Sequence, residues 1–225
     1  MPFTPPRRLA AAAFAVSALL AVPLTGSPAS ASPAGPVVLP EPSPASVARV
    51  EFADLAVDQP HAMTGYSRAK FPHWIEQGYS CNTREVVLER DGTDVLRDAQ
   101  CRATSGTWHS EYDGKDLNAA SQVDIDHVVP LANAWRSGAD AWSTAKRRDF
   151  ANDLTNPQLI AVSATSNRAK GDQNPAQWKP PLRSFWCTYA RAWTDVKHRY
   201  GLAVTAPEKT ALAEMLDTCP DPQHS

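Results

Sequence analysis

The chain has 225 residues, of which 43% are hydrophobic, 22 are basic and 24 are acidic. This length and composition supply enough apolar side chains for one folded domain with a core. The formal charge of −2 excludes a globally basic nucleic-acid-binding protein, so any attraction for phosphate must come from a local patch.

Residues 1–31 have the pattern of a secretory signal peptide. Arg7 and Arg8 precede an apolar run over 9–24, and the small residues Ala29-Ser30-Ala31 follow it. A membrane anchor is the alternative, but proline and glycine interrupt the end of the run and no charged stop-transfer flank follows. We expect cleavage after Ala31 and a secreted protein without a membrane segment. The remaining chain has 20 basic and 24 acidic residues, a formal charge of −4.

Residues 32–44 are rich in proline and poor in large apolar groups, which predicts a flexible leader. The folded domain is expected to cover 45–225. A first helix is predicted over 45–57, before Asp58-Gln59-Pro60, because apolar side chains recur there at the spacing of one helical face: Val47, Val50, Phe52, Leu55 and Ala56.

Strand patterns follow. The segment 85–90 is β-prone and leads into Asp91-Gly92, which predicts a strand and a hairpin turn. Further strands are predicted around 103–109, over 123–129 and over 159–162. Ser163 or Thr165 can then cap a short helix that carries the polar residues of 167–170.

Helix signals dominate the rest of the chain. We expect a helix over 131–135 and another that Ser143-Thr144 caps and that reaches about residue 152. A longer helix is predicted over about 184–200, with Gly201 as its stop. Thr205-Ala206-Pro207-Glu208 forms a capping box that begins a last helix ending near residue 216.

Four cysteines in an exported chain indicate disulfides, and three pairings are possible. We favour Cys81 with Cys101 and Cys187 with Cys219, because each pair closes a local loop within one half of the sequence. The alternative is a zinc site formed by all four cysteines. The chain has no C-x-x-C spacing, and an oxidising compartment disfavours free thiolates.

The segment Asp124-Ile125-Asp126-His127 is the first candidate for chemistry. On a strand, Asp124 and Asp126 share one face and His127 points to the other, so they can converge only where the strand ends or twists. Pro130 indicates that the strand ends nearby. An Asp-His pair alone is more often an ordinary surface or capping pair.

A wider pattern changes that interpretation. Asp126-His127-Val128-Val129-Pro130, then Asn156 before an apolar strand, then Ser166-Asn167-Arg168-Ala169-Lys170-Gly171-Asp172, resembles the ββα-metal motif of the HNH endonuclease superfamily. It is similar to the HNH domain of RNA-guided CRISPR nucleases. The span from Tyr66-Ser67-Arg68 to Cys219 resembles exported bacterial HNH-family proteins related to the nuclease domain of some modification-dependent restriction enzymes.

The resemblance implies an α+β fold with a ββα-metal core at about 120–175, flanked by N- and C-terminal helices. It also implies roles for single residues. Asp126 and Asn167 would be the ligands of one metal ion, His127 the general base and Asn156 the residue that braces the loop around that base. The last motif residue is often His, whereas here it is Asn167. Two oxygen ligands favour Mg²⁺ or Mn²⁺ over zinc.

Phosphate contacts are expected from Arg84, Arg168 and Lys170, and Arg84 is also a catalytic candidate. The predicted disulfide next to Arg84 would fix its backbone, and a guanidinium suits a phosphate. A salt bridge to Glu85 or Glu89 is the alternative role for Arg84, and a solvent-facing position is the alternative for Arg168 or Lys170. The seven tryptophans are expected mainly in the core rather than as stacking platforms for bases.

The sequence therefore predicts a secreted, monomeric endonuclease that cleaves nucleic acid, preferably DNA, with one Mg²⁺ or Mn²⁺ ion. Two alternatives remain open. One is a catalytically silent exported domain that binds nucleic acid or a cell-wall polymer. The joint presence of four motif residues argues against it: Asp126, His127, Asn156 and Asn167. The other is a hydrolase of a non-nucleotide phosphodiester, which only substrate assays distinguish.

Overall fold

The computed structural model describes residues 1–4 and 39–220. The apolar run and cleavage site of the predicted signal peptide, and residues 32–38 of the predicted leader, lie outside the described residues. The α-helices are α1 (Ala45–Asp54), α2 (Thr83–Asp91), α3 (Leu131–Arg136), α4 (Thr144–Ala151), α5 (Ala164–Lys170), α6 (Trp186–Tyr200) and α7 (Ala206–Leu216). The strands are β1 (Glu76–Gly78), β2 (Cys81–Asn82), β3 (Gly92–Arg97), β4 (Ala103–Ser110), β5 (Lys115–Leu117), β6 (Val123–His127) and β7 (Leu159–Ser163). Four short 3₁₀ turns, η1 (Arg68–Lys70), η2 (Ala120–Gln122), η3 (Ala139–Ala141) and η4 (Arg183–Phe185), complete the described elements.

A two-stranded sheet and one helix form the centre of the fold. Strands β6 and β7 pair antiparallel, with Ile125 opposite Ala161 and His127 opposite Leu159. Helix α5 begins directly after β7, where the Ser163 side chain accepts a hydrogen bond from the Ser166 amide, and it packs against both strands. Every residue of β7 is buried, which explains the apolar run of its first four residues.

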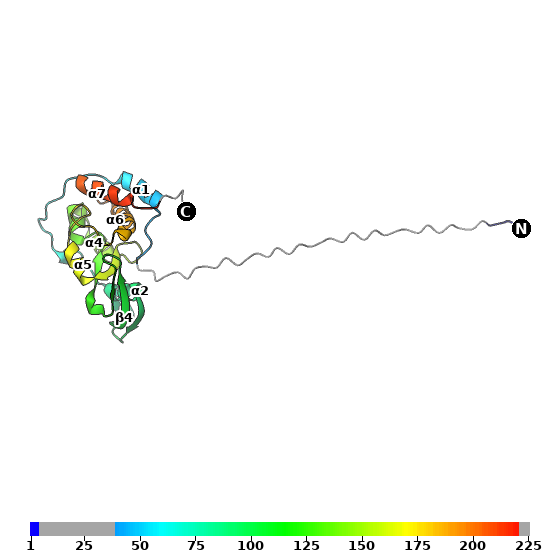
Figure 1. Cartoon of the computed structure of the whole chain (residues 1–225), viewed down its shortest axis with the longest axis horizontal. Helices are drawn as coiled ribbons and strands as arrows, with labels where there is room; N and C mark the ends of the chain where they lie inside the picture. Colours follow the sequence, from blue (N-terminus) through cyan, green and yellow to red (C-terminus); the bar gives the residue numbers. More distant parts are fainter. Residues whose placement is uncertain (5–38, 221–225) are drawn as a thin grey trace. The chain divides into compact units, whose positions relative to one another are not determined.

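A second layer contains α2 and the antiparallel sheet β3-β4-β5. Its buried residues, including Val87, Leu88 and Trp108, pack on the inner side chains of β6 and β7. The Trp108 indole donates to the Leu88 carbonyl, so this large side chain has its polar atom satisfied. Helix α2 and β4 lie beside each other at the end of the fold opposite α1 and α7 (Figure 1).

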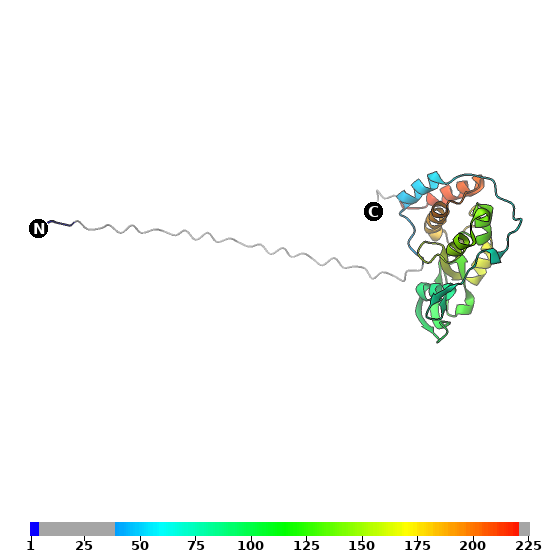
Figure 2. The ribbon, with the colours of Figure 1, turned by 180° about the vertical axis from the view of Figure 1, so that it is seen from behind.

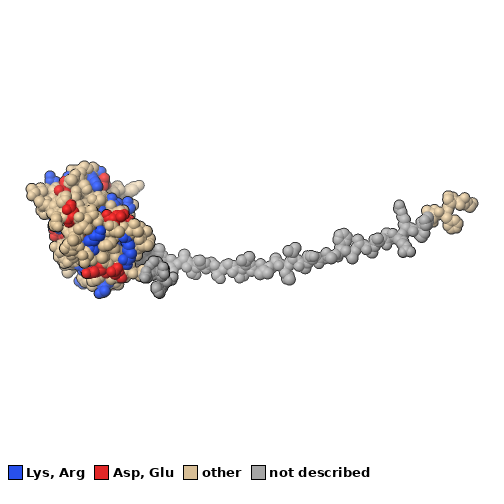
Figure 3. All heavy atoms as spheres, turned by 90° about the horizontal axis from the view of Figure 1, so that it is seen from above, with Lys and Arg blue, Asp and Glu red and all other residues tan. Residues whose placement is uncertain are grey.

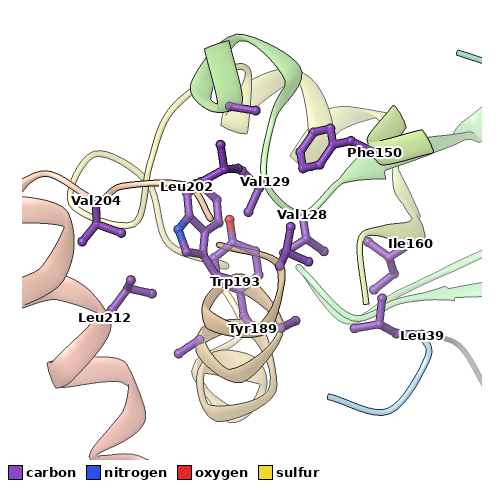
Figure 4. Close-up of a cluster of buried hydrophobic side chains, with 14 of the residues drawn as sticks. Leu39, Val128, Val129, Phe150, Ile160, Tyr189, Trp193, Leu202, Val204 and Leu212 are labelled. Carbon is purple, nitrogen blue, oxygen red and sulfur yellow. The ribbon is translucent and has the colours of Figure 1, made fainter. Parts of the chain in front are cut away.

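A third group consists of α1, α6 and α7, which lie side by side in the front view and from behind (Figure 2). Tyr189 and Trp193 of α6 are fully buried and pack with Val128 and Val129, which directly follow β6 (Figure 4). The Cys187–Cys219 disulfide ties α6 to the end of α7, and Cys81–Cys101 joins β2 to the β3–β4 connection. The favoured pairing is therefore confirmed, and no described cysteine remains for a zinc site.

Most predicted elements are present at or near the expected bounds, but the segment 85–90 was wrongly expected to be a strand. It belongs to α2, because Asn82 accepts from the Glu85 amide and the Glu85 carboxylate accepts from the Asn82 amide. This reciprocal capping box outweighs the β propensity of Val86 and Val87. Gly92 accordingly begins a strand instead of forming a hairpin turn.

Two expectations near the start of the domain also change. Residues 39–44 are part of the folded structure, since Leu39 is buried in the core and Arg191 donates to the Pro42 and Ser43 carbonyls. Helix α1 ends at Asp54, and its Val47 and Val50 are exposed, because only the face that contains Ala48 meets α6.

The surface carries both signs of charge. Lys and Arg side chains lie next to Asp and Glu on the face in Figure 3, in agreement with the near-neutral composition. All seven tryptophans are buried or partly buried, as expected. Within the described ranges, no helix combines the length and hydrophobicity that crossing a bilayer requires.

Candidate active site

A cleft of about 280 Å³ lies where β6, the start of α3 and the end of α5 meet the segment around Arg68. Asp126, His127, Asn167 and Arg168 all line it, although α5 is about forty residues downstream of β6. The antiparallel pairing of β6 and β7 produces this convergence. It places the beginning of α5 next to the start of β6, and α5 then packs against β6, so that its later residues reach the cleft. A larger cavity of about 660 Å³ elsewhere is lined by none of the predicted site residues.

Asp126 is buried at the side of this cleft. Its Oδ2 accepts hydrogen bonds from the Tyr112 hydroxyl at 2.6 Å and from the Lys170 ammonium at 2.7 Å. Burial raises the pKa of Asp126, while the charge and hydrogen bond of Lys170 act in the opposite direction. Both hydrogen bonds described for the carboxylate end on Oδ2, which leaves Oδ1 as the atom available to a ligand in the cleft.

His127 is held in one orientation. Its Nε2 lies 3.0 Å from the Ala151 carbonyl at the end of α4, and Trp74 stacks on its ring at a centroid distance of 5.5 Å. A carbonyl accepts only, so Nε2 carries the proton and Nδ1 keeps its lone pair. Burial lowers the pKa of His127 to about 3, which keeps the ring neutral. A neutral, oriented imidazole can accept a proton at Nδ1.

Asn167 is oriented by the second carboxylate of β6. Its Nδ2 donates to Asp124 Oδ2 at 3.1 Å, so the amide oxygen is the atom that remains for another partner. The Arg168 guanidinium lies 3.8 Å from the same Asp124 carboxylate. Asp124 therefore does not compete with Asp126 for a ligand in the cleft. It orients the side chains of Asn167 and Arg168 on α5.

The available donor atoms suit a small divalent cation. Asp126 and Asn167 both line the cleft and each offers an oxygen, the ligand type that Mg²⁺ and Mn²⁺ prefer. Within 39–220, the structure contains no group of three or more His, Cys, Asp or Glu residues suited to a metal. Two protein ligands fit Mg²⁺, which usually keeps several waters and binds substrate phosphate oxygens.

Two amide side chains, those of Asn156 and Gln158, lie just before β7. Asn156 donates to the Asp153 carboxylate at 2.8 Å and lies at a turn before β7. The fully buried Gln158 instead accepts from the Val129 amide and donates to the Val129 carbonyl, two residues beyond His127. Gln158 therefore fixes the loop that follows His127, and the bracing role of Asn156 stays a prediction.

The three predicted phosphate contacts occupy different environments. The Arg84 guanidinium donates to the Ala120 and Val123 carbonyls and does not line the cleft. Lys170 lines no part of the cleft either, because its ammonium is fully buried between the Asp126 carboxylate and the His127 carbonyl. Arg168 lines the cleft and its side chain is largely exposed, so it alone of the three can reach a bound phosphate there.

Several residues that position the site residues belong to no motif that the sequence reveals. Tyr112 supplies a hydrogen bond to Asp126, and Trp74 packs on the ring of His127. Asn152 lies next to the carbonyl that binds His127, and its amide donates to the Pro72 and Arg148 carbonyls. Isolated aromatic and amide residues give no periodic signal, so only the tertiary contacts identify them.

The chain matches a model of the family described as GmrSD restriction endonucleases, C-terminal domain, over residues 83–215. It is also 59% identical over 175 residues to an uncharacterized secreted protein of the fungus Arthroderma benhamiae, an alignment that covers 78% of this chain and 86% of that protein. No solved structure matches the chain.

These findings support a nuclease-related family. The relative is fungal, so the bacterial origin that the sequence suggested is not confirmed. The two disulfides and the name of the relative agree on a secreted location. The match covers more than half of the chain and includes β6, β7 and α5, so the chain belongs to the family of GmrSD restriction endonuclease C-terminal domains.

Proposed function

We propose that this chain is a secreted, metal-dependent endonuclease of the HNH type that hydrolyses phosphodiester bonds, with DNA as the substrate. One observation carries the proposal. A neutral imidazole with a free lone pair and two oxygen donors from different elements line the same small cleft. Phosphodiester hydrolysis requires a base for the attacking water and a means of stabilising negative charge on the phosphate.

His127 is the general base in this scheme. Its Nδ1 accepts a proton from the water whose oxygen attacks phosphorus, and the bond from phosphorus to the leaving oxygen then breaks. The Ala151 carbonyl holds the imidazole in the required tautomer and the Trp74 ring limits its rotation. A bound phosphodiester adds negative charge beside the ring, which raises its pKa and improves proton acceptance.

Asp126 through Oδ1 and Asn167 through its amide oxygen would hold one Mg²⁺ or Mn²⁺ ion. When bound, the ion supplies Lewis-acid stabilisation of the charge on the phosphate and the leaving oxygen. Tyr112 and Lys170 fix the Asp126 carboxylate from behind, and Asp124 fixes the Asn167 amide. Partners of this kind orient metal ligands in proteins. Arg168 is the cation of α5 that can reach substrate phosphate.

The test is cleavage of supercoiled plasmid by the purified mature protein with Mg²⁺ or Mn²⁺. We expect cleavage that EDTA stops and that His127→Ala lowers by about 100-fold or more, in line with the loss of a general base. His109→Ala is the matched control, because His109 pairs with Asp116 at an exposed position on β4, outside the cleft. Circular dichroism establishes that both variants fold.

Equal activity of His127→Ala and His109→Ala would remove His127 as the base. Activity that persists in EDTA would contradict the metal requirement. Parallel digests of matched DNA and RNA, together with a simple aryl phosphodiester, distinguish a DNase from an RNase and from a non-nucleotide phosphodiesterase.

A further inference from the structure

The segment 66–74 forms a wall of the cleft that is separate from β6, β7 and α5. Tyr66 and Arg68 line the cleft from this segment. The Tyr66 ring packs edge-on against Trp135 at 5.7 Å, and the buried Phe71 packs against Trp135 and Phe150. These aromatic contacts on both sides of η1 fix the backbone that carries Arg68.

A hydrogen-bond relay fixes the Arg68 side chain itself. His73 Nδ1 lies 2.8 Å from the Phe71 carbonyl, so Nδ1 carries the proton and Nε2 is an acceptor. Arg68 Nε donates to that Nε2 at 3.2 Å. The bond described for Arg68 uses only Nε, so both terminal nitrogens of the guanidinium remain for an acceptor in the cleft. Two parallel N–H groups are the geometry that binds phosphate best.

The two cleft arginines differ in their electrostatic surroundings. Arg168 lies 3.8 Å from the Asp124 carboxylate, which offsets part of its charge. Within the described ranges, Arg68 forms no ion pair with a carboxylate, because its partner is the imidazole of His73. Arg68 also lines the same cleft as Asp126 and His127. An uncompensated cation beside the proposed base favours an anionic ligand.

We propose that Arg68 binds the scissile phosphate from the segment 66–74 and that His73 positions its guanidinium. This inference rests on the proposed nuclease function and extends it to a residue outside the ββα unit. The phosphate would then contact Arg68 and Arg168 in the cleft that His127, Asp126 and Asn167 also line.

Binding is measured separately from cleavage by using the His127→Ala protein in EDTA with a fluorescein-labelled DNA duplex. We expect Arg68→Ala in this background to weaken binding by about 10-fold, and the slope of log K against log salt to fall by about one. Arg102→Ala is the matched control, because Arg102 is an exposed arginine that pairs with Asp98 and lies outside the cleft.

In the active protein, Arg68→Ala is expected to raise KM by about 10-fold, and Arg68→Lys to restore only part of the loss because lysine has no planar fork. The positioning role of His73 predicts that His73→Gln, which keeps an acceptor, has a lower KM than His73→Leu. A merely structural role would affect both His73 variants through stability, without this difference in KM.

If the wild type cleaves DNA but Arg68→Ala and Arg102→Ala have the same DNA affinity and the same KM, the assignment of Arg68 alone is overturned. A wild-type protein that neither binds nor cleaves DNA would overturn both the proposed function and this inference. Equal KM values for His73→Gln and His73→Leu would remove the positioning role of His73.

Discussion

Two regions of the molecule each contain a buried lysine paired with a buried carboxylate. In the β6–β7–α5 unit, Lys170 lies 2.7 Å from Asp126, and in the helical group Lys197 lies 3.3 Å from Glu208. Both ammonium groups are fully buried. Burial of such charges is costly unless hydrogen bonds satisfy the remaining polar atoms. The two pairs meet this requirement in different ways.

Glu208 uses both of its carboxylate oxygens within the protein. Oε1 accepts from the Trp193 indole and faces Lys197, and Oε2 accepts from the Thr205 amide as part of the capping box. Asp126 uses Oδ2 twice, for Tyr112 and Lys170. The difference suggests that the pair in the helical group serves stability, whereas the pair beside the cleft holds a carboxylate ready for a ligand.

The largest expected effect on stability comes from breaking the pair in the helical group. Lys197→Met leaves Glu208 charged and buried, so we expect the free energy of unfolding to fall by about 3–5 kcal/mol. Urea unfolding followed by tryptophan fluorescence measures it. The double variant Lys197→Met/Glu208→Gln removes the buried charge and keeps an N3 residue that suits a capping box, so it should recover most of the loss. A Lys197→Met protein as stable as the wild type would contradict the stabilising role of the Lys197–Glu208 pair.

The disulfides provide the next test. Cys187–Cys219 spans 32 residues of the helical group and Cys81–Cys101 spans 20 residues around β3. Loop-closure entropy predicts that Cys187→Ser/Cys219→Ser lowers the free energy of unfolding by about 4 kcal/mol, slightly more than Cys81→Ser/Cys101→Ser at about 3 kcal/mol. No cysteine lines the cleft, so the rate of cleavage per folded molecule should be unchanged in both. Loss of activity in well-folded protein would show that the cleft depends on a disulfide.

Breaking the pair beside the cleft should affect activity more than stability. In Lys170→Met, Asp126 keeps the Tyr112 hydrogen bond and lines the cleft, so we expect a loss of only about 1–3 kcal/mol of stability. Cleavage should fall by about 10–100-fold, because the ligand carboxylate loses the group that orients it. The control is Lys179→Met, which removes a partly exposed pair with Glu214 outside the cleft. Full activity of Lys170→Met would mean that Lys170 has only a structural role.

The sequence predicts most of the fold because its signals are local. Capping residues such as Ser143, Ser163 and Thr205 act within one turn of the chain, and the structure has each of them as an N-cap. The incorrect prediction of a strand at 85–90 also concerns a local signal. The Asn82–Glu85 capping box lies directly before the two valines and outweighs their β propensity.

The site is predictable only in part, because its supporting contacts are tertiary. The motif places Asp126, His127 and Asn167, and the structure brings all three to one cleft. The supporting contacts join residues that are far apart in the sequence, so no local pattern predicts them. Tyr112 reaches Asp126 from outside the motif, and Lys170, expected to contact substrate, is buried against Asp126 because α5 packs across β6.

The smallest effect concerns a carboxyl pair in the helical group. Glu51 of α1 faces Asp195 of α6, and burial together with the Asp195 carboxyl raises the pKa of Glu51 to about 7, against partial compensation from Arg199 and Ser43. A raised carboxyl pKa in the folded state gives stability that is complete below about 4.5 and lost as the pH rises through about 7.

The neighbouring His198 lies 3.8 Å from Glu51 and is partly exposed, so it modifies this dependence only weakly. We expect the wild type to lose about 1–2 kcal/mol more of its free energy of unfolding between pH 5 and pH 8 than Glu51→Gln loses, after allowance for partial exposure. The control Glu76→Gln, at an exposed position, should show the same difference from Glu51→Gln as the wild type does. Parallel pH profiles for the wild type and Glu51→Gln would show that the α1–α6 contact carries no proton-linked stability, and the contrast between the two regions would then rest on the lysine pairs alone.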